Sequence, residues 1–368
     1  MRIYNNQQAF FALAKAGLWE QEAQLLPLDK IDFSEVLNLA EEQSVVGLIA
    51  AGLEHVTDVK VPKTDVLQFV GQALQLEQQN TAMNNFIGVI VEKMREAGIY
   101  TLLVKGQGIA QCYERPLWRS CGDVDFFLDE ANYQKAKDYL LPLASDVEEE
   151  DKRRLHLGMT IDKWVVELHG SMRTAISRKV DDGIDAVQKS IFVDGEVRSW
   201  KNGDTYVFLP GANNDIILIF THFLKHFYVG GIGLRQICDW CRLLWTFRAD
   251  IDRKLLEKRF RSMHLMTEWK AFASFAVKWL GMPVDVMPLY DDSKKYNRKA
   301  DRISCLVLKA GNFGHNKDVS YRSKYSGLVR NVITFWRRFG EFMKVVAIFP
   351  ENAPKFFVNY VFGRIKAA

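Results

Sequence analysis

The stretch that decides the fold runs from Leu102–Gln107 (LLVKGQ) to Arg119–Leu128 (RSCGDVDFFL). Its two apolar runs predict short buried strands over Ile99–Val104 and Asp123–Leu128, because each run is brief and rich in branched or aromatic residues. Between them, the pattern over Gly106–Tyr113 predicts a short helix. A strand, a tight turn, a helix and a second strand therefore mark the beginning of an α/β core.

Two carboxylates emerge together from the second of these strands. Because side chains alternate along a strand, Asp123 and Asp125 share one face, while Val124 and Phe126 enter the core. Carboxylates held side by side repel each other, and that cost is usually tolerated where a hard cation lies between them. The pattern predicts a divalent-metal site at this edge of the sheet, with Asp123 and Asp125 as ligands and catalytic residues.

A third carboxylate is expected from a neighbouring strand. The segments Arg154–Ile161 and Trp164–His169 predict a hairpin around a two-residue turn that begins at Asp162. Glu167 and His169 share the face opposite the apolar residues of the second strand, where a lone charge is costly unless it is paired or bound to metal. Glu167 is therefore predicted as the third metal ligand and catalytic carboxylate, whereas its turn position already explains Asp162.

Four regions are predicted along the chain. They are a helical domain over residues 1–98, an α/β core over 99–210, a second helical domain over 211–320 and a basic aromatic tail over 321–368. The first domain includes one long helix from about Lys63 to Ala97, and residues 281–320 are expected to be rich in loops. The predicted fold class is α+β, a small mixed-sheet core flanked by N-terminal and C-terminal helical regions.

Length and composition indicate an ordered globular protein. With 368 residues, 48% of them hydrophobic, the chain can form two or three domains with real cores. Its first residues lack the pattern of a secretory signal, and no run approaches the roughly 18 apolar residues of a membrane span. The five cysteines form an odd, irregularly spaced set, which favours reduced thiols over a disulfide framework. We therefore expect a cytoplasmic protein.

The charge is distributed unevenly along the chain. The total is +4, yet residues 321–368 hold nine Lys/Arg against two Asp/Glu, so the first 320 residues carry about −3. The predicted core therefore lacks the strongly basic surface of a nucleic-acid-binding protein. A long polynucleotide is disfavoured as a substrate.

The tail has the pattern of a basic amphipathic helix. Its cations accompany eleven aromatic residues, and apolar residues recur at three and four between Val329 and Ile348, among them Phe335, Phe339 and Phe342. Such a helix can lie on an anionic membrane surface, which would make the protein peripheral to a membrane. It can also pack its aromatic stripe on the protein's own helical domain, and this second arrangement is favoured because it is the usual one in soluble enzymes.

The residues of the core resemble a known family. The run Leu103–Gly106, then Tyr113-x-x-Pro116-x-x-Arg119-x-x-x-Asp123-Val124-Asp125, then Glu167-Leu168-His169, is similar to the uncharacterised nucleotidyltransferase family of the DNA polymerase β-like superfamily. The resemblance covers roughly residues 99–240, including His222-x-x-x-His226 and Arg235-x-x-x-Asp239. It implies a mixed sheet flanked by helices and the transfer of a nucleoside monophosphate from a triphosphate.

The residues beside the carboxylates predict a triphosphate site. Gly106 lets the backbone approach a phosphate, and the N–H groups that open the following helix, at Gln107, can bind it. Arg119 and Ser120 lie in the loop before the second strand, where a guanidinium can bind phosphate; a solvated loop arginine is the alternative. Lys105 can reach a phosphate or pair with the acidic residues as a structural counterion.

Polar residues of later helices are expected to line the acceptor side of the cleft. His222 and His226 share one face of an otherwise apolar helix, and Arg235 and Asp239 form a stripe on the next helix. Together with His169, they are predicted to contact the acceptor or to accept its proton. Satisfied core histidines are the alternative.

A zinc site is a weaker rival interpretation. It would combine His222 and His226 with Cys238 and Cys241, residue types and spacings that zinc accepts. Core packing already explains both cysteines, because they follow the apolar positions of their helix.

These expectations describe an enzyme. The predicted activity is that of a nucleotidyltransferase dependent on Mg²⁺ or Mn²⁺, which uses a nucleoside triphosphate, expected to be ATP, and a hydroxyl-bearing small molecule or protein as acceptor. The alternative is a catalytically inactive nucleotide-binding sensor or scaffold with the same fold. The three carboxylates favour the enzyme, whereas Gln107, which follows Gly106 where the superfamily usually has Gly or Ser, favours the alternative.

Overall fold

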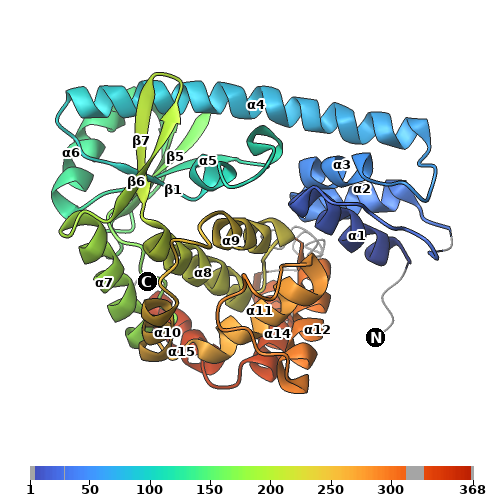
Figure 1. The fold of residues 1–368 in the computed structure, drawn as a ribbon. Helices are drawn as coiled ribbons and strands as arrows, with labels where there is room; N and C mark the ends of the chain where they lie inside the picture. Colours follow the sequence, from blue (N-terminus) through green and yellow to red (C-terminus); the bar gives the residue numbers. More distant parts are fainter. Residues whose placement is uncertain (1–4, 29, 312–326, 366–368) are drawn as a thin grey trace.

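The structure is a computed structural model that describes residues 5–28, 30–311 and 327–365. Its longest helix, α4 (Lys63–Glu96), runs along one side of the molecule and joins the N-terminal helices at one end to the sheet at the other (Figure 1). The N-terminal helices are α1 (Asn5–Trp19), α2 (Phe33–Glu42) and α3 (Val46–Glu54). α4 therefore connects these two parts of the fold.

The central sheet has five strands in the order β1-β2-β5-β4-β3. The strands are β1 (Leu102–Val104), β2 (Asp123–Phe127), β3 (Ala144–Val147), β4 (His156–Ile161) and β5 (Trp164–His169). β2 and β5 are parallel and all other neighbours are antiparallel, so the sheet is mixed. The short helix α5 (Gly106–Ala110) and the 3-10 turn η1 (Pro116–Trp118) connect β1 to β2, while α6 (Glu130–Leu140) and η2 (Leu141–Leu143) connect β2 to β3.

The register of the sheet brings polar residues from three strands together. Asp125 of β2 lies opposite Glu167 of the parallel strand β5. On the other side of β5, His156 of β4 lies opposite His169. The two-residue turn between Ile161 and Trp164 sets this second pairing, because one pair of opposed residues determines every other pair in a regular hairpin.

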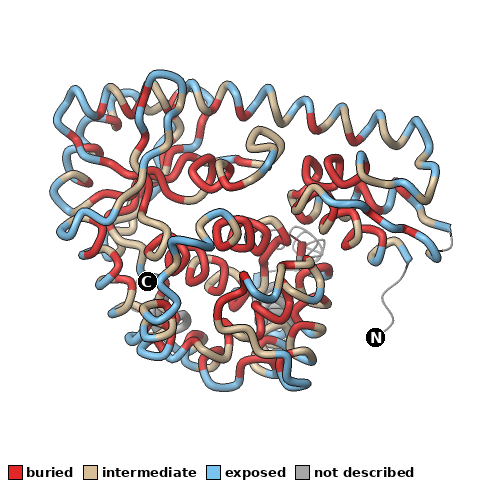
Figure 2. Tube along the Cα trace, in the orientation of Figure 1, coloured by how far each residue is buried: buried red, intermediate tan, exposed pale blue. Residues whose placement is uncertain are grey.

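Most of the remaining elements form a helical layer beside the sheet. They are α7 (Arg178–Phe192), α8 (Ala212–Val229), α9 (Leu234–Thr246), α10 (Arg253–Ser262), α11 (Met266–Leu280), α12 (Lys294–Ala310), α14 (Gly327–Ile348) and α15 (Ala353–Ile365). The hairpin of β6 (Val197–Asn202) and β7 (Thr205–Pro210) packs instead against β1 and α4 (Figure 1). Helices α8, α9 and α11 are buried along most of their length (Figure 2). Phe220 of α8 is at the centre of this core, with its ring centroid 5.1 Å from those of Phe260 and Trp269.

The N-terminal helices also contact the C-terminal helical layer directly. Trp19 Nε1 donates a hydrogen bond to the carbonyl of Leu280 over 2.6 Å, and Gln43 Nε2 donates one to the carbonyl of Val307 over 3.0 Å. The buried Gln43 side chain also accepts from the backbone N–H of Leu234. The N-terminal helices therefore pack directly against α11 and α12.

The main predicted elements of the core are confirmed, and so is the α+β class. The strands expected over residues 99–104, 123–128, 154–161 and 164–169 correspond to β1, β2, β4 and β5, and the long helix corresponds to α4. The expectation of a loop-rich segment over 281–320 is wrong in part, because α12 occupies residues 294–310. α7, β3 and the β6–β7 hairpin were not predicted at all.

The predicted tail helix exists as α14, and its C-terminal end packs on the protein. Val345, Ile348 and Phe349 are buried, and the Phe349 ring centroid lies 5.9 Å from that of Phe227 in α8. Among the helices that the structure describes, none combines the length and apolar character needed to cross a bilayer. Contact of the tail with a membrane surface stays a prediction.

Candidate active site

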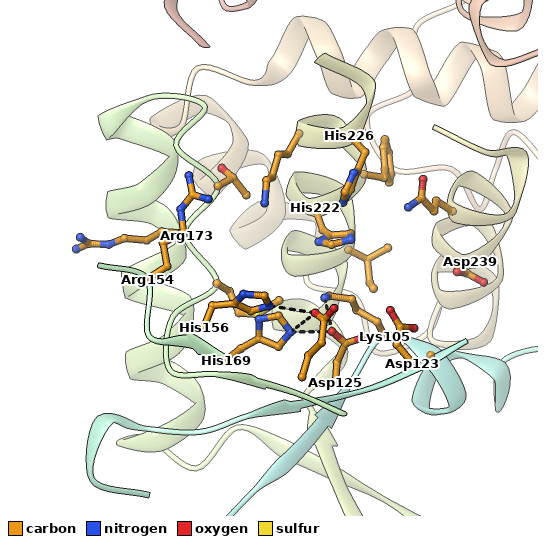
Figure 3. Close-up of a pocket in the computed structure, with 18 of the residues that line it drawn as sticks. Lys105, Asp123, Asp125, Arg154, His156, His169, Arg173, His222, His226 and Asp239 are labelled. Atoms are coloured by element: carbon orange, nitrogen blue, oxygen red, sulfur yellow. Dashed lines mark hydrogen bonds and ion pairs between the residues drawn. The ribbon is translucent and has the colours of Figure 1, made fainter. Parts of the chain in front are cut away.

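A cavity of about 340 Å³ opens between the sheet and the helices α8 and α9 (Figure 3). It is lined by all the residues predicted for the site except Gln107 and Ser120. Those predicted residues are Lys105, Gly106, Arg119, Asp123, Asp125, Glu167, His169, His222, His226, Arg235 and Asp239. Side chains that lie more than 130 positions apart in the sequence, such as those of Lys105 and Asp239, therefore line one cavity in the fold.

Asp125 is the most deeply buried carboxylate of the cavity, with only 2% of its surface exposed. Its Oδ1 atom accepts hydrogen bonds from Lys105 Nζ and contacts His169 Nε2, both over 2.7 Å. Burial alone would raise the pKa of Asp125, but the positive charge of Lys105 and the contact with His169 outweigh it and lower that pKa. Asp125 is therefore held as a carboxylate.

Lys105 is a counterion to this carboxylate. Burial favours the neutral amine, yet the charge of Asp125 overcomes that effect and raises the pKa of Lys105. Of the two roles predicted for Lys105, the structure shows the ion pair, and the side chain lines the same cavity.

Asp123 differs from Asp125 in its surroundings. The charge of Asp125 raises the pKa of Asp123, and burial adds to the effect. Within the described residues, no hydrogen bond or ion pair to the Asp123 carboxylate is found. Two carboxylates therefore face one cavity, and the charges of Lys105 and Arg235 oppose the rise in the pKa of Asp123 without cancelling it.

Glu167 is held by two imidazoles. Its Oε2 atom lies 3.1 Å from His156 Nε2 and 3.3 Å from His169 Nε2. Hydrogen bonding to His156 and His169 lowers the pKa of Glu167 far below its usual range. The side chains of Asp123, Asp125 and Glu167 thus supply three carboxylates to one wall of the cavity.

The opposite wall carries positive charge that sequence reasoning did not identify. Lys225 of α8, Arg154 and Arg173 all line the cavity, and Arg173 pairs with Asp185 of α7. Burial lowers the pKa of Lys225 to about 8, and the nearby charge of Arg154 contributes. Anions that enter the cavity meet cations on this side.

The two histidines of α8 face the cavity as predicted (Figure 3). The ring centroids of His222 and His226 lie 4.6 Å apart. Burial and the nearby lysines lower the pKa of His226 to about 3, and burial lowers that of His222 well below its usual value. Both imidazoles are therefore neutral at pH 7 and can hydrogen-bond to a ligand, but their lowered pKa values make them weak proton acceptors.

Arg119 makes a buried ion pair that was not predicted. Its Nε and Nη2 atoms donate to the two carboxylate oxygens of Asp239 in α9, over 3.0 and 2.6 Å. Tyr113 donates its hydroxyl to the same carboxylate over 2.8 Å. Arg119 is therefore neither a solvated loop residue nor a free phosphate ligand, and it joins the loop before β2 to α9.

The guanidinium of Arg235 is less completely paired than that of Arg119. Its Nη1 donates to the carbonyl of Ser120 over 2.6 Å, while its buried Nε has no hydrogen-bond partner within the described residues. Burial and the charge of Arg119 lower the pKa of Arg235. Arg235 therefore brings an incompletely paired cation to the side of the cavity where Asp123 lies.

The turn at Gly106 has a tight backbone that a larger residue would not fit. Lys105 and Gly106 both have positive φ, of 57° and 37°, and a Cβ on Gly106 would lie 3.2 Å from Cys121 Sγ. The side chain of Gln107 points away from the cavity, because its Nε2 donates to Asn80 Oδ1 in α4. Ser120 contributes its carbonyl to Arg235 instead of lining the cavity. Gln107 and Ser120 therefore do not direct their side chains into the cavity, and phosphate binding by the backbone N–H groups at Gln107 stays a prediction.

The rival zinc site of α8 and α9 is not formed. Cys238 and Cys241 are buried in the core, and burial raises the pKa of both thiols. Throughout the described ranges, the side chains that gather closely enough to hold a metal ion are His156, Glu167 and His169, which include neither cysteine.

His156 is the functional candidate that sequence reasoning missed. The signal was present, because the turn predicted at Asp162 places His156 directly opposite His169 in the hairpin. Lys225, Arg154 and Arg173 had no such signal, since single cations on a helix or in a loop usually face solvent.

Comparison with known proteins gives one match. No curated protein and no solved structure matches the chain. A family model described as "Uncharacterised nucleotidyltransferase" matches residues 29–281, which is more than half of the chain and includes every residue of the cavity named above.

Proposed function

This chain belongs to the uncharacterised nucleotidyltransferase family, and from that membership we propose that it transfers a nucleoside monophosphate from a nucleoside triphosphate to a hydroxyl group of an acceptor. Mg²⁺ or Mn²⁺ is the proposed cofactor, ATP is the proposed triphosphate, and Asp123, Asp125 and Glu167 are the proposed metal ligands. A nucleotidyltransferase needs a divalent ion of this kind to neutralise the charge of the triphosphate and of the departing pyrophosphate.

The observation that carries the proposal is the arrangement of the three carboxylates. They come from two adjacent parallel strands, face the same cavity and include one carboxylate, that of Asp123, whose pKa is raised by the charge of its neighbour. Oxygen ligands in such a cluster fit a hard divalent cation. The three carboxylates suit this ion by ligand type, but among the described residues their oxygens do not all lie within 4.8 Å of one another, so an ion would have to draw them together.

Phosphate binding is proposed for the turn at Gly106 and the cations around it. Lys105, Arg119 and Arg235 all line the cavity, and Arg235 keeps the buried Nε without a partner among described residues. In this arrangement Gln107 and Ser120 contribute through the backbone. Arg119 also holds Asp239 and thereby α9.

The acceptor is proposed to bind between the carboxylates and α8. His169, His222 and His226 line this part of the cavity, and the two neutral imidazoles of α8 can hydrogen-bond to the acceptor at a ring nitrogen. The cavity volume of about 340 Å³ suits a small molecule or one protein side chain.

Removal of two of the three carboxylate charges tests the proposal. The variant Asp123→Asn/Asp125→Asn should lose Mg²⁺-dependent binding of ATP, measured by calorimetric titration, and release of pyrophosphate in the presence of hydroxyl-bearing acceptors. Asp162→Asn is a matched control, because Asp162 is exposed at the hairpin turn and asparagine accepts its positive φ of 54°. ATP binding with unchanged Mg²⁺ dependence in the double variant would show that the metal assignment is wrong.

A further inference from the structure

Two histidines direct the same ring atom at one carboxylate oxygen. His156 Nε2 and His169 Nε2 lie 3.1 and 3.3 Å from Glu167 Oε2. Their ring centroids are 4.7 Å apart, and the three ligand atoms all lie within 4.8 Å of one another. The side chains come from adjacent strands whose paired register determines their positions, so the arrangement does not depend on a loop.

The two separations from Glu167 Oε2 match those between the ligands of a tetrahedral metal ion. Ligand atoms about 2.1 Å from one zinc ion lie about 3.4 Å from each other. Two imidazole nitrogens and one carboxylate oxygen are also a ligand set used by catalytic zinc, which keeps a fourth position open. Mg²⁺ prefers six oxygen ligands and waters, so the same three residues suit it poorly.

We propose that His156, Glu167 and His169 form a binding site for a borderline transition-metal ion, with Zn²⁺ as the best-fitting candidate, beside the carboxylate pair of Asp123 and Asp125. The inference goes beyond the proposed function and shares one residue with it. Both imidazole contacts use Oε2 of Glu167, so Oε1 takes no part in either of them. A carboxylate with two oxygens can serve two neighbouring ions.

Accessibility supports this assignment. Glu167, His156 and His169 all line the cavity, so an ion can reach the site and a fourth ligand can come from water or substrate. His156 and Glu167 keep 33% and 27% of their side-chain surface exposed, whereas a structural ion pair has no need of this access. Asp125 also contacts His169, but Lys105 already balances its charge.

The experiment is a titration of the full-length protein with Zn²⁺ in the absence of nucleotide. The wild-type chain, stripped of metal with chelator, should bind Zn²⁺, and His156→Gln should weaken that binding by about tenfold or more, since even the loss of a residue behind a ligand costs 10- to 100-fold. His226→Gln is the matched control: His226 lines the same cavity on α8 and should leave Zn²⁺ affinity unchanged. Circular dichroism confirms that each variant is folded.

A spectrum of the wild-type protein with Co²⁺ in place of Zn²⁺ gives a second measurement that requires no substitution. Imidazole ligands in a four-coordinate site should produce intense visible absorption, which water-bound Co²⁺ lacks. Weak absorption together with unchanged Zn²⁺ affinity in His156→Gln would mean that the histidines only hydrogen-bond to Glu167, and the inference would be overturned. Equal losses in His156→Gln and His226→Gln would overturn the assignment to these three residues.

The outcome is separable from that of the proposed transfer reaction. Asp123→Asn/Asp125→Asn should retain the imidazole-dependent Co²⁺ spectrum even though it loses Mg²⁺-dependent ATP binding. If ATP binding fails in the wild-type protein while the spectrum is present, the function is wrong and the metal site stands. If ATP binding is present and the spectrum is absent, the proposed metal site is wrong and the proposed function stands.

Discussion

At the scale of single residues, the cavity is divided between opposite charges. Asp123, Asp125 and Glu167 lie on the sheet side, and Lys225 with two arginines lies across from them. The three carboxylates could be identified from the sequence because charged residues stand out in short apolar strands. The ion pair of Arg119 with Asp239 could not be identified, since these two residues are 120 positions apart and no local pattern joins them.

Lys225 makes a prediction about the effect of pH on stability. Its pKa in the folded protein is lowered from 10.5 to about 8, mainly by burial. Between these two values the unfolded chain binds a proton that the folded chain does not, so the stability of the folded state rises with pH. Below pH 8 the buried charge has its full destabilising effect.

The variant Lys225→Met should therefore be more stable than the wild type at pH 7. This advantage should shrink as the pH rises from about 8 toward 10.5, where the wild-type lysine is neutral in both states. Urea unfolding at several pH values measures the difference. Lys179→Met, at an exposed position of α7, is the control and should change stability little at any pH. A constant difference for Lys225→Met across this range would contradict the predicted shift.

At the scale of secondary structure elements, the prediction was best where the period of the sequence was clear. β1, β2, β4, β5 and α4 follow from alternation or from three-and-four spacing, and the two-residue hairpin turn also determines which residues of β4 and β5 are opposed. These patterns were used to place the elements, but the hairpin turn was not used to pair the residues of β4 with those of β5. His156 was therefore overlooked.

The missed elements have weak local signals. β3 is a largely exposed edge strand with a register irregularity after Ala144, so it shows no alternation of buried and exposed residues. α12 begins in a strongly polar segment from Lys294, whose charges resemble those of a loop. Its buried residues Ala300, Ile303 and Val307 show helical spacing, and the polar residues between them hid that spacing.

The ion pair between Arg119 and Asp239 should contribute strongly to the packing of α9 against the loop before β2. Both side chains are buried, with 5% and 6% of their surfaces exposed. Asp239→Asn leaves a buried guanidinium without its counter-charge, which should lower the free energy of unfolding by about 3 kcal/mol. Urea unfolding followed by circular dichroism measures the change.

Two further variants make the result interpretable. Glu257→Gln removes one carboxylate from the exposed pair with Arg261 and should cost less than about 1 kcal/mol. The double variant Arg119→Met/Asp239→Leu removes both charges and should be more stable than Asp239→Asn alone, because no unpaired charge stays buried. If the free energy of unfolding of the double variant falls by the sum of the decreases in Arg119→Met and Asp239→Leu, the two residues do not interact.

At the scale of the whole molecule, the C-terminal helices complete the core of the helical layer. Asn352 donates to the buried carboxylate of Glu268, which also accepts from the hydroxyl of Tyr228. Phe349 packs beside Phe227 of α8. The packing of the tail on the protein's own helical domain was predicted from its amphipathic pattern, but the residues that it contacts were not, because they are distributed over α8 and α11.

A chain that ends at Ser320 should therefore be less stable than the full-length protein. It lacks Val345, Ile348 and Phe349, and burial of each such side chain contributes about 1.5 to 3 kcal/mol, so the loss should exceed about 3 kcal/mol. Thermal unfolding of the two chains measures it. Trp336→Ala is the control, because Trp336 on α14 is 63% exposed and its loss should change the melting temperature little. Equal melting temperatures for the two chains would show that the tail does not stabilise the core.

The contact between the N-terminal helices and the C-terminal layer has a consequence for the synthesis of the protein. Gln43 and its acceptor Val307 are 264 residues apart. A ribosome that adds roughly 5–20 residues per second needs about 15 to 50 seconds to make that length. Throughout this time the nascent N-terminal helices present the faces that will cover α11 and α12, with Phe11 and Trp19 among their apolar residues. Those faces are the surfaces on which a chaperone at the ribosome would act first.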